Sequence, residues 1–357
     1  MKLKIHFNGL NTLRFFAAFS VLIFHSSQWY HHDFSTPFKM FLHNLPVAVD
    51  FFFILSGFLI IYLLLAEKNS SKTINLKNFY IRRFLRIFPL YYLIITITYL
   101  FLQNKGEIIA WDKFSYFFGN FSMITKNAWT HTALNPLWSI NIEEHFYFII
   151  PFLVFITPIK HLKYLFWLII ITSILFRIYA TITIPNNWMT IYMHTLSQMD
   201  LLAIGGLLAL YHFKYKFKFQ LPIFIFLIIF LGFLIIMSLV DSKDYSNLYF
   251  ASIKKYIFTI PLILLLLLFV FDDNKNFNIL KNNKALNYLG RISYGIYLYN
   301  SIIIDKLDKF TWLHQHYYIK ILLDIFVTLI IAIISYELFE KQFLKFKGKF
   351  QIIKTKQ

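Results

Sequence analysis

The sequence contains no cysteine, which excludes disulfide bonds, thiolate nucleophiles and cysteine-ligated zinc or iron–sulfur sites. It is also poor in charge: 15% of its residues are Asp, Glu, Lys or Arg, whereas soluble domains contain about 25%. No polar stretch as long as a domain and no linker rich in glycine or serine divides the chain. These absences exclude a water-soluble enzyme that is held at a membrane by one helix.

Hydrophobic residues make up 58% of the chain, and its mean hydropathy is +0.59. A helix that crosses about 30 Å of hydrocarbon needs about 20 mostly apolar residues. The sequence therefore predicts an all-α, polytopic integral membrane protein with about ten transmembrane helices. We place these helices near residues 10–30, 47–66, 88–103, 138–157, 162–184, 196–213, 221–240, 256–271, 286–304 and 318–339.

Basic residues outnumber acidic ones by 35 to 17, which gives a net charge of +18. If the N-terminus is cytoplasmic, 22 basic residues fall in segments predicted on the cytoplasmic side and nine in segments on the outer side. Because Lys and Arg collect on the cytoplasmic side of membrane proteins, this count favours both termini in the cytoplasm and explains the charge without a nucleic-acid partner. Lys2 and Lys4 precede an apolar run, as in a signal peptide, but Arg14 interrupts that run and no cleavage site follows.

Ionisable side chains inside membrane helices are costly and often mark functional sites. The first predicted helix contains Arg14 and His25, which lie eleven residues, or about 16 Å, apart on nearly the same face. A histidine can take a proton from a hydroxyl near neutral pH, although His25 could also be a packing residue and Arg14 could extend to lipid headgroups. Asp50 lies at the start of the second helix, where it could stabilise the helix N-terminus, orient an imidazole or hold an arginine.

An arginine-rich segment with the sequence Arg82-Arg83-Phe84-Leu85-Arg86-Ile87-Phe88-Pro89 ends the loop before the third predicted helix. On a helix, Arg83 and Arg86 would share a face and could clamp a phosphate. The segment could equally follow the positive-inside rule without binding any ligand.

The fourth predicted helix begins with a polar group of four residues, Asn141, Glu143, Glu144 and His145. Asn141 and Glu144 could form a capping box, with Glu143 stabilising the first turn. Two carboxylates beside a histidine at the outer face could instead handle protons or bind a cation.

Five segments resemble the membrane-bound acyltransferase-3 family, the bacterial O-acyltransferases of surface polysaccharides. They occur in the family's order, cover nearly the whole chain, and comprise Leu10 to His25, Asp50 to Phe58, Arg82 to Pro89, Trp138 to Tyr147 and Gly290 to Leu298. Two positions depart from the family pattern. Asn11 stands where the family usually has aspartate, and many members carry histidine near Asn300.

The resemblance implies transfer of an acyl group, most often acetyl, from cytoplasmic acetyl-CoA to a sugar hydroxyl of an extracytoplasmic glycan. It also implies a multi-pass protein of the bacterial inner membrane, whose partners are acyl-CoA, membrane lipids and a surface glycan or lipid-linked oligosaccharide. No metal is expected. The residues that the resemblance assigns to acyl-CoA binding are Arg14, Arg82, Arg83 and Arg86.

The same resemblance implies that His25 matches the family's essential histidine and that Glu143 and Glu144 match its acidic pair. We expect His25 to act as the general base or as a transient carrier of the acyl group. We expect a carboxylate of Asp50, Glu143 or Glu144 to hold its imidazole in the useful tautomer. These four residues form the expected catalytic group.

We expect a transmembrane acyltransferase domain over residues 1–340 and a short basic cytoplasmic tail over 341–357. Larger members of the family carry an extracytoplasmic hydrolase-like domain, whereas only a short basic tail follows the predicted transmembrane domain here. We therefore expect a stand-alone membrane enzyme that acts on O-antigen lipopolysaccharide or an exopolysaccharide. A transporter or flippase would also place charges within the membrane, but no internal repeat supports it. A scaffold that binds anionic lipid would explain the arginines, but not His25 or the glutamate pair.

Overall fold

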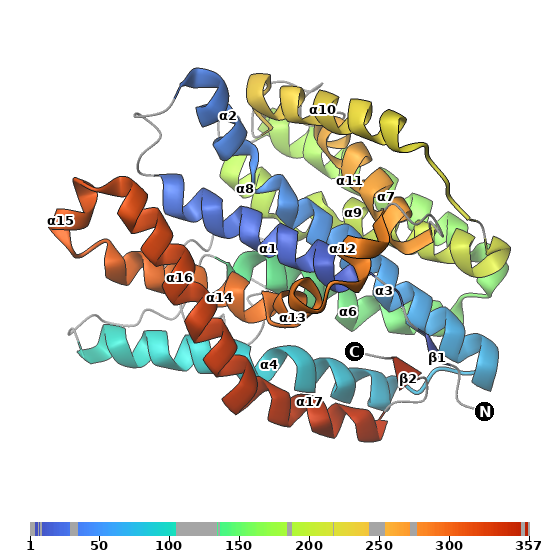
Figure 1. The fold of residues 1–357 in the computed structure, drawn as a ribbon. Coiled ribbons are helices and arrows are strands. Elements are labelled where there is room, and N and C mark those ends of the chain that lie inside the picture. Colours follow the sequence, from blue (N-terminus) through green and yellow to red (C-terminus); the bar gives the residue numbers. More distant parts are fainter. Residues whose placement is uncertain are drawn as a thin grey trace.

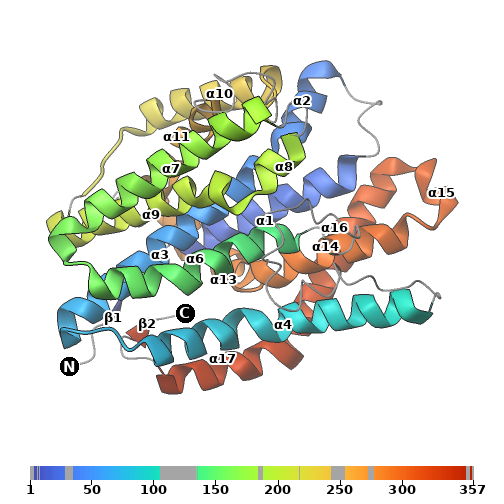
Figure 2. The same cartoon turned by 180° about the vertical axis from the view of Figure 1, so that it is seen from behind.

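The computed structural model describes residues 4–5, 7, 9–28, 35–104, 134, 136–183, 188–216, 218–242, 254–271, 277–350 and 354–355. The regular elements in these ranges are helices, apart from strands β1 (Lys4–Ile5) and β2 (Lys354–Thr355), which pair in parallel. Figures 1 and 2 show the long helices gathered into one bundle. The strand pair joins the two ends of the chain at one end of that bundle, which we call the terminal end (Figure 1).

The described helices agree with the all-α prediction. The longer ones are α1 (Leu10–Ser27), α3 (Val47–Ser71), α4 (Leu76–Asn104), α6 (Leu137–Ile156), α7 (Leu162–Thr183), α9 (Thr195–Tyr215), α10 (Ile223–Leu239), α11 (Lys255–Phe271), α14 (Ser293–Leu307) and α16 (Tyr317–Ser335). The shorter ones are α2 (Thr36–Asn44), η5 (Ile159–His161), α8 (Trp188–Met193), α12 (Asn278–Asn282), α13 (Lys284–Arg291), α15 (Thr311–His314), η8 (Tyr336–Glu340), α17 (Lys341–Lys347) and η9 (Gly348–Phe350).

Six helical stretches in the described ranges are long and apolar enough to cross a membrane. The apolar helices α10 and α11 are shorter, with 17 residues each. The protein is therefore a multi-pass membrane protein, as predicted, whereas a count of ten spans and the side of each terminus remain predictions.

Two predicted boundaries differ from the structure. Helix α4 begins at Leu76 and continues through Pro89, so the arginine segment is helical and does not lie in a loop. A proline inside a helix removes one backbone hydrogen bond, and neighbouring helices in a membrane protein compensate for that loss. The span predicted over 286–304 is divided at Ile292 into α13 and α14.

Glycines allow two pairs of helices to approach backbone to backbone. A Cβ atom on Gly57 would lie 2.0 Å from the Leu202 carbonyl oxygen of α9. A Cβ atom on Gly290 would lie 1.9 Å from the Asn11 carbonyl oxygen of α1. Small residues at such crossings increase packing between membrane helices, so these glycines fix α3 on α9 and α1 on α13.

A buried polar network joins α7, α9 and α11. Arg177 and Asp200 form an ion pair of 2.8 Å, and their side chains are 1% and 0% exposed. Lys255 lies 3.1 Å from Oδ1 of Asp200. The Tyr256 hydroxyl donates at 2.7 Å to Oδ2, the oxygen that also pairs with Arg177. Because charged groups in a membrane interior need partners, this network stabilises the packing of the three helices.

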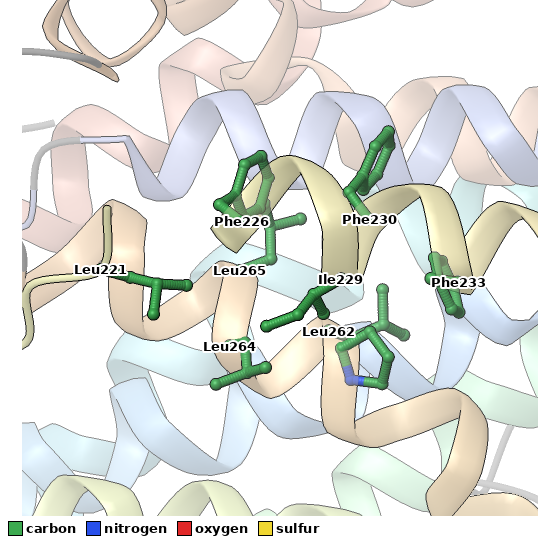
Figure 3. A pocket seen from close by; sticks show the side chains of 9 residues that line it. Leu221, Phe226, Ile229, Phe230, Phe233, Leu262, Leu264 and Leu265 are labelled. Atoms are coloured by element: carbon green, nitrogen blue, oxygen red, sulfur yellow. The ribbon is translucent and has the colours of Figure 1, made fainter. Parts of the chain in front are cut away.

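Helices α10 and α11 enclose a small pocket lined by apolar side chains and Pro261 (Figure 3). Its lining includes Leu221, Phe226, Phe230 and Leu262. The pocket contains no side chain that could transfer a proton or bind an anion, so it is suited to hydrocarbon and not to acyl-transfer chemistry.

Candidate active site

His25 lies near the C-terminal end of α1, away from the terminal end, and its ring is held by α14. Its Nδ1 atom is 2.6 Å from Oδ1 of Asn300, and the imidazole is half-buried. The described partner of this nitrogen is therefore an amide, and a carboxylate partner of His25 stays a prediction. The Asn300 amide occupies that position because α1 and α14 pack together along their length.

The orientation of Asn300 determines which nitrogen of His25 carries the proton. The Nδ2 group of Asn300 donates to the carbonyl oxygens of Tyr297 at 2.6 Å and Ile296 at 3.2 Å. Its Oδ1 atom therefore faces His25 and can only accept a hydrogen bond. In the neutral imidazole that pairs with it, Nδ1 carries the hydrogen and Nε2 carries the basic lone pair.

A second group of polar side chains lies nearer the terminal end, where Arg14 of α1 meets the arginine segment of α4. Arg14 interacts electrostatically with Arg83 and Arg86, and Arg83 also stacks over the Tyr147 ring at 5.7 Å. In the described part of the chain, Arg14, Arg83 and Arg86 form no ion pair, and the Arg83 Nε group is buried without a hydrogen-bond partner. Three cations that repel one another at this site are well suited to a bound polyanion.

Arg82 is different from its neighbours because its guanidinium group is already engaged. It pairs with Glu67 at 3.1 Å and donates to the carbonyl oxygen of Phe350 at 2.8 Å. Glu67 in turn accepts from the backbone N–H of Asn75 at 2.8 Å. The contacts therefore give Arg82 the role of linking the C-terminal segment to α3 and α4.

Glu143 and Glu144 lie beside the arginines, inside α6. Glu143 accepts hydrogen bonds from Ser56 and Tyr147, both at 2.9 Å, and interacts electrostatically with Arg14. Glu144 has a buried Oε1 atom that has no hydrogen-bond partner among the described residues. Their described neighbours are Ser56 of α3 and the arginines of α1 and α4, whereas a position at the outer face stays a prediction.

The capping-box interpretation of Asn141 and Glu144 is also wrong. Helix α6 begins at Leu137, so both residues lie inside the helix and not at its first turn. Asn141 instead accepts a hydrogen bond from the Tyr91 hydroxyl of α4 at 2.8 Å. His145 forms a 2.9 Å contact with the Thr195 hydroxyl of α9, which makes it a link between helices.

Asp50 lies in the first turn of α3 and belongs to the buried network of α7, α9 and α11. Its charged neighbours are Lys255, Asp200 and Arg177, and its Oδ1 atom has no hydrogen-bond partner in the described residues. The structure thus gives Asp50 contacts that differ from those of His25 and of the arginine group.

Helix α14 connects the two polar groups, with three side chains that each contact a different helix. Tyr294 donates to the Ile87 carbonyl of α4 at 3.0 Å, next to Arg86. The Tyr297 hydroxyl is 2.7 Å from that of Ser139 on α6, and Asn300 holds His25 on α1. These residues are spaced by three along the helix and so share one broad face. Their contacts fix α1, α4 and α6 around α14.

Residues 7–337 match the model of a family described as an acyltransferase domain. The chain belongs to the acyltransferase-3 family. This result confirms the resemblance that the five sequence segments indicated.

Curated members of this acyltransferase family include two that the chain resembles over most of its length. It is 27% identical over 320 residues to "Peptidoglycan O-acetyltransferase OatA" of Listeria monocytogenes, with 82% of this chain and 50% of the relative covered. It is 26% identical over 356 residues to "O-acetyltransferase OatA" of Staphylococcus aureus, with 93% and 56% covered. The chain thus spans about half the length of these relatives. No solved structure matches it.

Sequence reasoning missed Asn300 and Tyr147 as site residues. Asn300 was noted only as a departure from the family pattern, although a polar amide in a membrane helix needs hydrogen-bond partners. Its spacing from Tyr294 and Tyr297 would have indicated a polar face on α14. Which helix that face contacts depends on tertiary packing, and the sequence does not contain a local signal for it.

Proposed function

We propose that this acyltransferase transfers an acetyl or related acyl group from acyl-CoA on the cytoplasmic side to a glycan hydroxyl at the outer face of a bacterial inner membrane. The single observation that carries the proposal is that Arg14, which lies with the unpaired Arg83 and Arg86 of α4, and His25 occupy different depths along α1. The two residues lie eleven positions apart, which corresponds to about 16 Å along a helix.

The arginine group is the site for the donor. Arg14, Arg83 and Arg86 can form charge-assisted hydrogen bonds with the phosphates of coenzyme A, which would relieve their mutual repulsion. The long, flexible pantetheine arm could then extend toward His25 past the polar side chains of Ser56, Tyr297 and Ser139. Arg82 supports this site indirectly, since it holds the C-terminal segment against α4.

His25 acts on the acceptor in this proposal. Its Nε2 atom takes the proton of the sugar hydroxyl while the oxygen attacks the thioester carbonyl carbon. The carbon–sulfur bond then breaks, and the imidazolium returns its proton to the thiolate, so the products are the ester and free coenzyme A. If Nε2 instead carries the acyl group before the hydroxyl attacks, it needs the same lone pair.

The acceptor is a cell-envelope glycan. One relative is named as a peptidoglycan O-acetyltransferase, so peptidoglycan belongs among the candidates together with O-antigen and exopolysaccharide. A transporter or flippase remains the alternative function, and it would require intramembrane charges but no ester product.

The test is mass spectrometry of envelope glycans from cells with the intact gene, without it, and with His25→Ala. A general base contributes about 10²- to 10⁴-fold, so an alkali-labile ester should be present with the intact protein and fall at least about 100-fold with His25→Ala. His161→Ala is the matched control, because His161 is exposed on η5 and should leave the ester unchanged. An ester that persists in the His25→Ala strain would overturn the assignment of His25. No ester in any strain would favour transport.

A further inference from the structure

The last α-helix that the structure describes, α17, packs on the arginine-bearing helix α4. After the π-helical turn η8, α17 runs alongside α4, as Figure 1 shows. Arg82 fastens this arrangement through its hydrogen bond to the Phe350 carbonyl, just beyond the end of α17. The segment predicted as a basic tail therefore places its lysines next to the donor site of the proposed function.

Only one of the lysines on α17, Lys347, is buried. Lys341 and Lys345 are exposed and bind Glu337 and Gln342 on their own side of the helix. Lys347 is 7% exposed and interacts electrostatically with Arg14, Arg82, Arg83 and Arg86. Within the described residues it forms no hydrogen bond and no ion pair.

A buried ammonium group among guanidinium groups is unfavourable without an anion, because desolvation and repulsion both oppose its charge. Glu340 interacts electrostatically with Arg86, but it does not pair with Lys347. A lysine needed for packing alone would be replaced by an apolar residue at lower cost. The placement of Lys347 therefore indicates a ligand with several negative charges.

We propose that Lys347 binds a phosphate of the acyl-CoA donor together with Arg83 and Arg86. The inference rests on the proposed function, because it assigns one more residue to the same donor site. It also gives the C-terminal helix a direct part in donor binding, so that this helix completes the site and is more than a cytoplasmic tail.

The experiment measures acetyl-CoA binding to the purified full-length protein by calorimetry, in detergent without phospholipid so that no lipid headgroup supplies the phosphate. Lys347→Gln should raise the Kd about tenfold or more, as expected for loss of a charge-assisted hydrogen bond. Lys345→Gln, an exposed position on the same helix, is the matched control and should bind as the wild type does. Repeating the titration with dephospho-CoA identifies the phosphate, since the effect of Lys347→Gln disappears there only if Lys347 contacts the 3′-phosphate.

Thermal unfolding without ligand provides a second measurement that a folding defect would not reproduce. Removing an unpaired buried charge should raise the Tm of Lys347→Gln above that of the wild type, while the rise in Tm on adding acetyl-CoA should shrink. Unchanged acetyl-CoA binding in Lys347→Gln, together with weaker binding in Arg83→Gln, would overturn the role of Lys347 alone. Unchanged binding in both variants would overturn the donor site itself.

Discussion

The hydrogen bond between Asn300 and His25 leads to a quantitative prediction. Replacing Asn300 with alanine removes the acceptor that holds the hydrogen on Nδ1 at 2.6 Å. The imidazole can then adopt the other tautomer, in which Nε2 carries the hydrogen and is no longer a base. A hydrogen bond contributes about 0.5–1.5 kcal/mol net, and each 1.36 kcal/mol is a factor of ten. For a bond in the upper half of that range, about 1.0–1.5 kcal/mol, we expect kcat to fall about 5- to 13-fold.

The effect of Asn300→Ala should be smaller than that of His25→Ala, since a general base contributes about 10²- to 10⁴-fold. Folding should be little affected, because the carbonyl oxygens of Ile296 and Tyr297 belong to a helix and the amide is only an additional donor to them. Asn300→Asp keeps an acceptor beside Nδ1 and should retain more activity than Asn300→Ala. The KM for acetyl-CoA should not change in either variant, because Asn300 contacts the histidine and not the arginines.

The assay is transfer of radiolabelled acetyl from acetyl-CoA to glycan in membranes, with kcat and KM determined separately. Ser301→Ala is the matched control. Its hydroxyl donates to the same Oδ1 atom at 3.1 Å, but the orientation of the amide is fixed by its Nδ2 contacts. An unchanged kcat in Asn300→Ala would refute the tautomer argument, as would a Ser301→Ala variant that loses as much activity as Asn300→Ala.

Two further predictions concern stability in detergent, measured by thermal unfolding. Gly290→Ala should destabilise the protein by about 3 kcal/mol or more, because its Cβ would lie 1.9 Å from a backbone oxygen of α1. Gly232→Ala is the control, because a Cβ atom there meets nothing within 4 Å in the described part of the chain, and it should be neutral or slightly stabilising. Arg177→Met should cost about 3–5 kcal/mol, since it leaves the buried Asp200 without one of its cations. Lys341→Met breaks an exposed pair with Glu337 and should leave the Tm unchanged, so equal losses in both variants would contradict the burial argument.

The sequence predicted features that depend on one helix at a time. Hydropathy placed the helices, and the spacing of Arg14 and His25 placed them on one face of α1. Each of these features follows from residues that are neighbours in the chain, so periodicity and composition suffice.

The sequence did not predict which helices meet. The partner of His25 is 275 residues away, and no local pattern distinguishes Asn300 from a carboxylate as that partner. Lys255 lies just outside the helix predicted over 256–271, yet it forms an ion pair with Asp200 inside the bundle. Arg82 and Arg83 are adjacent and chemically identical, but only the first meets Glu67. Such differences arise from tertiary contacts, which decide whether a charge is paired or left for a ligand.

The contacts of α14 explain how one bundle could serve substrates on two sides of a membrane. A donor at the arginine group and an acceptor at His25 can react only if the helices that carry them keep a fixed axial offset. Tyr294 fixes α14 to α4 beside Arg86, whereas Asn300 fixes it to α1 at His25. About 9 Å of helix separates these two contacts, so in the proposed function α14 holds the donor and acceptor sites at a fixed axial offset. A variant that loosens one contact should thus impair transfer more than it impairs donor binding, because binding needs only one end of this helix.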